Sequence, residues 1–234
     1  MLRQRISFMK QARRYSSRIQ SQLDILGVEN IPKIGPCLIT INHYSRPRFP
    51  SWWLALSVSA AVPVDIRWII TSAWTFPDKA RARFLTPITE AVFPQIAWCF
   101  DFFTMPPMPP RPQDINRRAL AVRHVLHIAT QILESGNGSQ LMIGLAPEGG
   151  DRTGGALGSP PPGAGRFIEH LTRMGLEIVP VGIYEESSSL CLNFGAKYKL
   201  SLQPGSSKNE RDRDVSRSVM EHIAAMLPEK LGYQ

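Results

Sequence analysis

Two short segments of the sequence combine residue types that can do chemistry, and the first is Asn42-His43. The pair follows residues 37–41, an apolar and β-rich run that ends abruptly, which is the pattern of a buried strand. In open α/β sheets, ligands bind beyond the carboxyl ends of the strands. We therefore expect His43 to lie in a site, where its imidazole could exchange a proton near neutral pH.

The second segment is a loop rich in glycine and proline that follows the apolar run 141–145. It contains Glu148, Gly149 and Arg152. Exposed backbone N–H groups together with a guanidinium suit a phosphate, so we expect Gly149 and Arg152 to bind substrate. Because Asp151 places a negative charge beside the arginine, a surface loop with a solvated ion pair is the alternative.

The elements that must position these segments alternate between strands and helices. Apolar runs and helical periodicity predict strands at 37–41, 66–71, 141–145, 177–183, 190–194 and 197–202, and helices at 114–135, 164–174 and around 215–226. Pro180 favours an edge or bulged position in its strand. The alternation predicts an α/β fold with a mixed, mostly parallel sheet covered by helices. Residues 49–64 are expected in the core, and residues 76–112 show no clear periodicity.

Residues 1–30 are expected to form a basic amphipathic helix ahead of an α/β domain at 31–234. Six basic residues precede the first acid, and apolar residues recur at three-to-four spacing. Such a helix could lie in an anionic membrane interface, with its apolar face buried among the lipids. It could equally pack on the domain and leave a solvated basic face, and the sequence leaves both alternatives open.

The composition limits the partners of the chain. Its net charge of +8 predicts attraction to something anionic, and no zinc-finger or RNA-recognition pattern indicates a specific nucleic acid. Three cysteines without C-x-x-C spacing predict neither a disulfide framework nor a zinc site. His124 and His127 are three apart on a predicted helix, more often a mark of a helix face than of a metal site. Without a recognisable secretory signal, we expect a cytoplasmic location.

Three segments, by their order and spacing, resemble the glycerolipid acyltransferases, the family of lysophosphatidate and glycerol-3-phosphate acyltransferases. They are the strand ending in Asn42-His43, residues 146–152, which are similar to the family's Phe-Pro-Glu-Gly-Thr-Arg, and residues 178–183, which are similar to its last block. The resemblance spans residues 33–200. It implies an α/β acyltransferase without a bound cofactor, peripheral on the cytoplasmic membrane face, which moves an acyl group from acyl-CoA or acyl carrier protein to a hydroxyl of a phosphorylated glycerolipid.

The resemblance also implies roles for single residues. His43 would be the general base that takes the proton of the acceptor hydroxyl, with Glu148 supporting catalysis. Asn42, Gly149 and Arg152 would contact the substrate.

The sequence departs from the family pattern at Arg48, which we place among the substrate-binding residues. It stands where the family has the aspartate that orients the histidine. A guanidinium cannot accept a hydrogen bond from the imidazole, and it disfavours a charged His43. Three explanations stay open: another carboxylate (Glu148, Asp101 or Asp65) replaces the aspartate, the activity is weak, or the domain only binds lipid or acyl chains.

Overall fold

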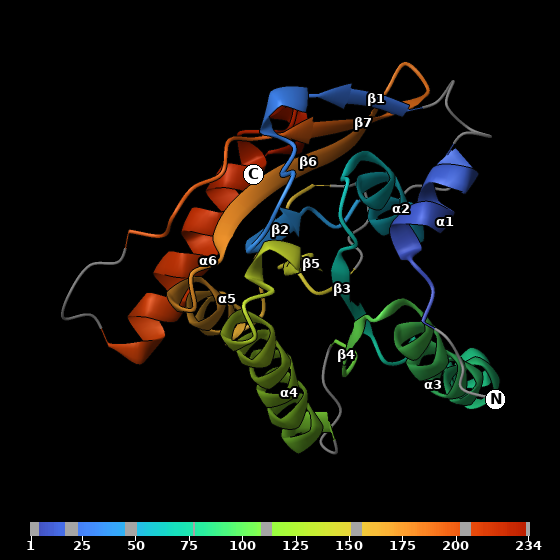
Figure 1. Ribbon diagram of the computed structural model, residues 1–234. Coiled ribbons are helices and arrows are strands. Elements are labelled where there is room, and N and C mark those ends of the chain that lie inside the picture. The colour runs from blue at the N-terminus through green and yellow to red at the C-terminus, as the bar shows by residue number, and fades with distance from the viewer. Residues whose placement is uncertain are drawn as a thin grey trace.

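Over the residues that the structure describes, the chain forms a seven-stranded sheet with helices on both of its faces (Figure 1). The computed structural model describes residues 5–16, 23–44, 51–76, 78–108, 114–150, 156–201 and 207–232. The strands are β1 (Leu23–Leu26), β2 (Cys37–Ile41), β3 (Arg67–Thr71), β4 (Phe103–Met105), β5 (Met142–Leu145), β6 (Glu177–Glu186) and β7 (Ser189–Phe194). The helices are α1 (Phe8–Ser16), α2 (Trp52–Ala61), α3 (Lys79–Phe100), α4 (Asp114–Glu134), α5 (Ala164–Arg173) and α6 (Lys208–Ala224).

The sheet is mixed and mostly parallel, as the sequence predicts. Its strand order is β1-β7-β6-β2-β5-β3-β4. The strands from β6 to β4 in this order are parallel, whereas β7 is antiparallel to β6 and parallel to β1. Strands joined through helices and parallel to one another produce this α/β class.

Strand β6 corrects the expectation that Pro180 marks an edge, because β6 pairs with β2 on one side and with β7 on the other. Its ladder to β7 begins only at Val181, and Ile178 forms an isolated bridge to Tyr198. The missing N–H of Pro180 therefore falls in a break of the pairing. An interior strand tolerates proline at such a break because no ladder bond is lost there.

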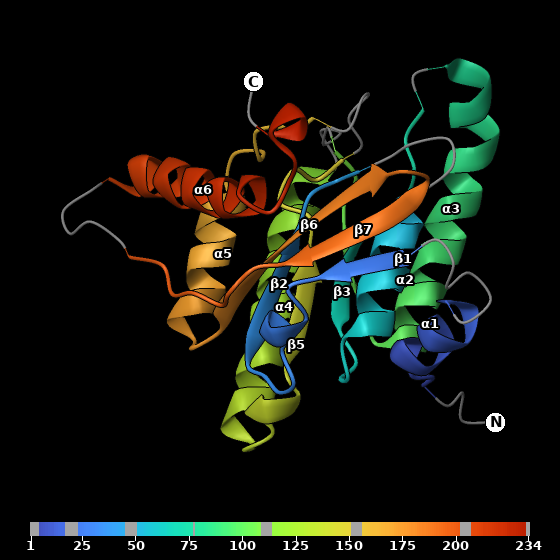
Figure 2. The ribbon, with the colours of Figure 1, turned by 90° about the horizontal axis from the view of Figure 1, so that it is seen from above.

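Two hydrophobic clusters fill the space between the sheet and its helices. One cluster packs α1 and α2 against the sheet, with Leu54 and Val58 fully buried. The other cluster packs α4, α5 and α6 against the opposite face, with Val219 and Ile223 at its centre. Figures 1 and 2 show α1, α2 and α3 at one end of the molecule and α5 and α6 at the other.

The N-terminal segment differs from the single helix expected over residues 1–30. Helix α1 covers only Phe8–Ser16, and Leu23–Leu26 form strand β1 at the edge of the sheet. Asp65 fixes the start of α1, since its carboxylate accepts bonds from the Ser7 hydroxyl and the Met9 N–H. Side chains of β1 alternate between partly covered and exposed, a pattern that suits a strand better than a helix.

Two other segments have a secondary structure that the sequence did not predict. Helix α3 occupies most of the region 76–112, where the sequence shows no periodicity, and it contains Pro87 and Pro94. The strand predicted at 197–202 is wrong over the described residues of that range, because only Tyr198 pairs, through a single bridge. The apolar stretch 49–64 contributes α2, whose buried residues confirm its predicted place in the core.

Candidate active site at the carboxyl edge of the sheet

Strands β2 and β5 bring the two predicted chemical segments together. The strands are adjacent and parallel, and Thr40 is level with Leu145. His43 lies two residues after the end of β2, and Glu148 lies three residues after the end of β5. Because parallel neighbours end at the same edge of a sheet, segments 105 residues apart in sequence meet there.

The contact between the segments is a hydrogen bond to a buried carboxylate. Oε2 of Glu148 accepts the backbone N–H of His43 at 2.6 Å, and Oε1 accepts the backbone N–H of Gly158 at 2.6 Å. Glu148 is only 7% exposed. Bonds to an ionised acceptor are short and about twice as strong as neutral ones, so Glu148 clamps the loops after β2 and β5 to each other.

A tight turn explains the residue types around Glu148. The N–H of Gly149 donates to the carbonyl of Ala146 at 3.1 Å, which closes a turn with Pro147 at its second position. Gly149 has a φ of 72°, a left-handed conformation that other residues rarely adopt. Proline and glycine are favoured at these turn positions. The Pro-Glu-Gly segment therefore directs Glu148 inward, and binding of substrate by Gly149 stays a prediction.

The side chain of Asn42 extends the pairing of β2 beyond the end of the strand. Its Nδ2 donates to the carbonyl of Ile183 at 2.8 Å, and its Oδ1 accepts the N–H of Ile183 at 2.7 Å. Asn42 is 1% exposed. The amide thus replaces a backbone partner for β6 and fixes the direction in which the chain leaves β2. Binding of substrate by Asn42 stays a prediction.

His43 follows this anchored residue and precedes Tyr44, which is buried in the core. Its side chain is half-buried, and its Nδ1 is shielded from solvent. The imidazole is therefore held between two fixed neighbours and still reaches the surface of the carboxyl edge. Arg48 and Arg152, predicted to bind substrate, lie outside the described residues.

Two of the three carboxylates that could replace the missing aspartate lie at the amino ends of the strands, on the side of the sheet opposite to His43. Asp101 accepts a bond from Arg67 at 2.8 Å, and Asp65 precedes Arg67 by two residues. Arg67 and Leu38 are both level with Ile143. From Leu38, β2 runs three further residues before Asn42, about 10 Å at the usual rise of a strand. Asp65 and Asp101 are therefore not brought to His43, whereas Glu148 is.

Sequence reasoning missed two backbone partners of the site. Gly158 supplies an N–H to Glu148, and Ile183 supplies both of its backbone groups to Asn42. Backbone partners leave little trace in residue types, since any residue has the same N–H and C=O groups. Among the residues that the structure describes, no group of three or more histidine, cysteine or acidic side chains could hold a metal ion.

Comparison with known proteins adds one structural likeness. No family model matches the chain, and no curated protein matches its sequence. Among solved structures, the chain is similar to the 1-acyl-sn-glycerophosphate (LPA) acyltransferase PlsC from Thermotoga maritima, with 15% identity and a TM-score of 0.49. That similarity covers 93% of this chain and 79% of the other. The α/β class itself follows from the sheet and its helices.

Proposed function

We propose that the protein is a glycerolipid O-acyltransferase that uses acyl-CoA or acyl carrier protein as its donor. The observation that carries this proposal is the bond between His43 N–H and Glu148 Oε2. It joins at one sheet edge the two segments that resemble the catalytic and phosphate-binding segments of that family. Residues 178–183, which resemble the family's last block, lie in β6, the other neighbour of β2.

In this reaction His43 acts as general base. The acceptor hydroxyl gives its proton to the imidazole while its oxygen attacks the thioester carbonyl. The tetrahedral intermediate then expels the thiolate, which takes the proton back from the imidazolium. Because Nδ1 is shielded from solvent, Nε2 would be the nitrogen that takes the proton.

Glu148 and Asn42 are positioning residues in this proposal. Glu148 holds the backbone of His43, and Asn42 holds the end of β2 on β6. Arg152 and Gly149 would bind the phosphate of the acceptor. Arg48 would contact the same anionic substrate.

Release of free CoA thiol tests the proposal, with purified protein, an acyl-CoA and lysophosphatidate as acceptor. We expect His43→Ala to lower the rate by about 10²- to 10⁴-fold, the usual contribution of a general base. His127→Ala is the matched control, because His127 is an exposed histidine on α4 and should leave the rate unchanged. Equal rates for the wild type and His43→Ala would refute the role of His43.

A second candidate function, binding of lipid or acyl chains without turnover, is favoured by Arg48, which stands where the family has the aspartate that orients the histidine. Arg48→Asp separates the candidates. A gain in CoA release would identify an impaired catalytic site, and an inactive wild type that still binds acyl chains would favour pure binding.

A further inference from the structure

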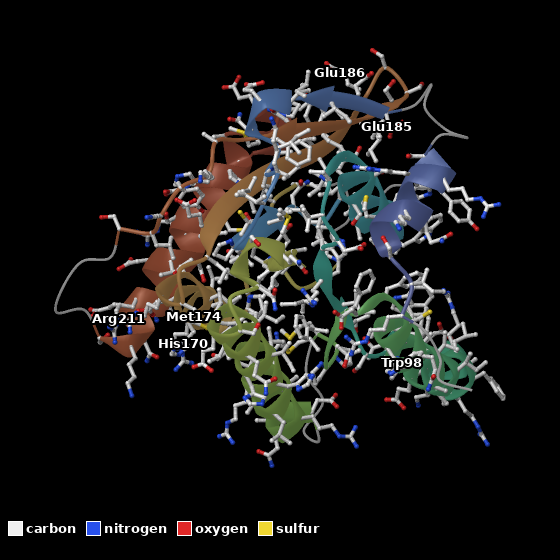
Figure 3. All side chains as sticks on the ribbon, viewed as in Figure 1. Trp98, His170, Met174, Glu185, Glu186 and Arg211 are labelled. Carbon is white, nitrogen blue, oxygen red and sulfur yellow. The ribbon has the colours of Figure 1, made fainter. Side chains whose placement is uncertain are left out.

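Helix α3 leaves much of its apolar surface exposed, although Phe93, Ile96 and Phe100 are partly buried. The residues that it buries are Thr86, Thr89 and Ala97. Five large apolar side chains of the same helix are exposed, and we call them the docking face: Phe84, Leu85, Ile88, Val92 and Trp98. At 3.6 residues per turn they fall within an arc of about 140°, opposite the buried side. Figure 3 shows Trp98 on α3, at the end of the molecule opposite to His170 and Arg211.

Polar and aromatic contacts on the other side of α3, and not the docking face, attach the helix to the protein, and Phe93 packs edge-on against Trp74 with ring centroids 5.1 Å apart. The hydroxyl of Thr89 accepts the N–H of Trp74 at 3.0 Å and donates to the carbonyl of Thr86 at 2.9 Å. At the other end of the helix, the carbonyl of Cys99 accepts the N–H of Ile6. A soluble helix normally buries its apolar stripe and exposes its polar one. Packing within the fold therefore does not explain why the docking face is apolar.

The charges around the docking face suit an anionic partner. Lys79, Arg81 and Arg83 fall in the first five residues of α3, whose first turn has no acid. Positive side chains at a helix N-terminus oppose the helix dipole. Arg81 is paired with the N-cap Asp78, whereas Lys79 and Arg83 are exposed. Glu90 is the single acid in the sequence of α3.

Helix α1 adds basic residues at the same end of the molecule. Phe8 of α1 packs edge-on against Phe100 of α3, with ring centroids 5.1 Å apart. Lys10, Arg13 and Arg14 are exposed, whereas Ala12 is fully buried. The apolar side of α1 is thus used inside the protein, so of the two alternatives for the N-terminal helix, packing on the domain is the one observed. Helix α1 supplies charge, and α3 supplies exposed apolar surface.

The start of α3 lies on the carboxyl side of the sheet, as the candidate active site does. Strand β3 ends at the same carboxyl edge as β2, and α3 follows β3 in the chain. With 22 residues, α3 is about 33 Å long, roughly twice the length of the five-residue strand β3. Figure 2 shows α3 extending past the ends of the strands.

We propose that the docking face binds the interface of an anionic phospholipid bilayer, with α3 lying in the plane of the headgroups. Large exposed apolar patches mark docking sites, and a helix with one apolar face beside basic residues is typical of interfacial binding. Anionic headgroups would bind the basic residues of α3 and α1. In the described residues no helix is long and apolar enough to cross a membrane. Membrane binding by the docking face does not depend on acyl transfer, so it can be measured without catalytic turnover.

Sedimentation with vesicles tests the proposal, using equal parts of phosphatidylglycerol and phosphatidylcholine against phosphatidylcholine alone. We expect the wild type to bind the anionic vesicles more strongly, with affinity falling as salt is added. Phe84→Gln with Ile88→Gln removes two side chains that are 66% and 57% exposed. This double variant should bind at least about tenfold more weakly, since each lost insertion removes apolar burial.

The matched control is Val28→Gln with Ile34→Gln. These side chains are 60% and 68% exposed, and they lie near the amino end of β2, away from α3. The control should bind like the wild type, as should His43→Ala, which separates docking from catalysis. Thermal unfolding checks that every variant is folded.

Three outcomes would overturn the proposal. The first is wild-type protein that does not bind anionic vesicles, and the second is a double variant that binds as well as the wild type. The third is a control pair that loses as much binding as the double variant does.

Light scattering detects a fourth outcome that would overturn the proposal. If the wild type is a dimer, the double variant is a monomer and neither binds vesicles, the docking face is an interface between two copies.

Discussion

Helices α3 and α6 are both amphipathic, but they use their apolar sides in opposite ways. Helix α6 buries Val215, Val219, Met220 and Ile223 against the sheet. Helix α3 fully buries only two threonines and an alanine, and it exposes five large apolar side chains. The comparison teaches that periodicity reveals an apolar face without revealing what covers it. In α6 that face stabilises the fold, and in α3 it is free for a partner outside the chain.

The largest expected contrast is in stability. Ile223→Ala should lower the free energy of unfolding by about 2–5 kcal/mol, because it leaves a cavity in a packed core. Ile88→Ala should change it by less than about 0.5 kcal/mol, as for a surface substitution. Urea unfolding measures both. A similar loss for the two variants would mean that α3 packs into the core, and the comparison would fail.

The N-caps of the two helices give a smaller contrast. Ser207 caps α6 by accepting the N–H of Glu210, and Asp78 caps α3 by accepting the N–H of Arg81. Ser207→Ala should lower global stability by about 1 kcal/mol, since α6 unfolds only with the core. Asp78→Ala should instead fray α3 locally, because few buried contacts hold that helix.

Amide hydrogen exchange separates these two results. Faster exchange is expected in the first turns of α3 for Asp78→Ala, without a change in the midpoint of global unfolding. If Asp78→Ala lowered that midpoint as much as Ser207→Ala does, α3 would belong to the cooperative core.

The smallest expected effect is a pH dependence confined to α6. The carboxylate of Glu210 accepts the backbone N–H of Ser207, and hydrogen bonds from the side chain and backbone of Ser207 lower the pKa of Glu210. A lowered pKa in the folded state adds stability above the ordinary pKa of glutamate, and this stability is lost as the pH falls through the lowered value. Glu210→Gln should therefore destabilise less than Ser207→Ala at neutral pH, and the difference from wild type should vanish in acid. A difference that persisted in acid would contradict this role of the charge.

Much of the fold could be predicted from local patterns. The runs at 37–41 and 190–194 became β2 and β7, and the stripe after Asp114 became α4. These segments combine one clear period with recognisable ends. The region 76–112 could not be predicted because the stripe of α3 includes threonines on its inner side and prolines within it. The edge position expected as one alternative for Pro180 is wrong for a different reason, since a break in pairing inside the sheet accepts proline as readily as an edge does.

By itself the sequence determined the strand that ends in Asn42-His43, the Pro147-Gly149 turn chemistry and the α/β class, because each depends on residues that are near one another in the chain. Only the tertiary structure decided that Glu148 binds the backbone of His43 and that Asp65 and Asp101 lie at the amino edge of the sheet. It also decided that the apolar side of α1 packs on the protein, whereas the docking face of α3 is exposed. The physical reason is that these contacts depend on strand order and register. The contacts join residues that are far apart in the sequence, so a pattern of neighbouring residues does not reveal them.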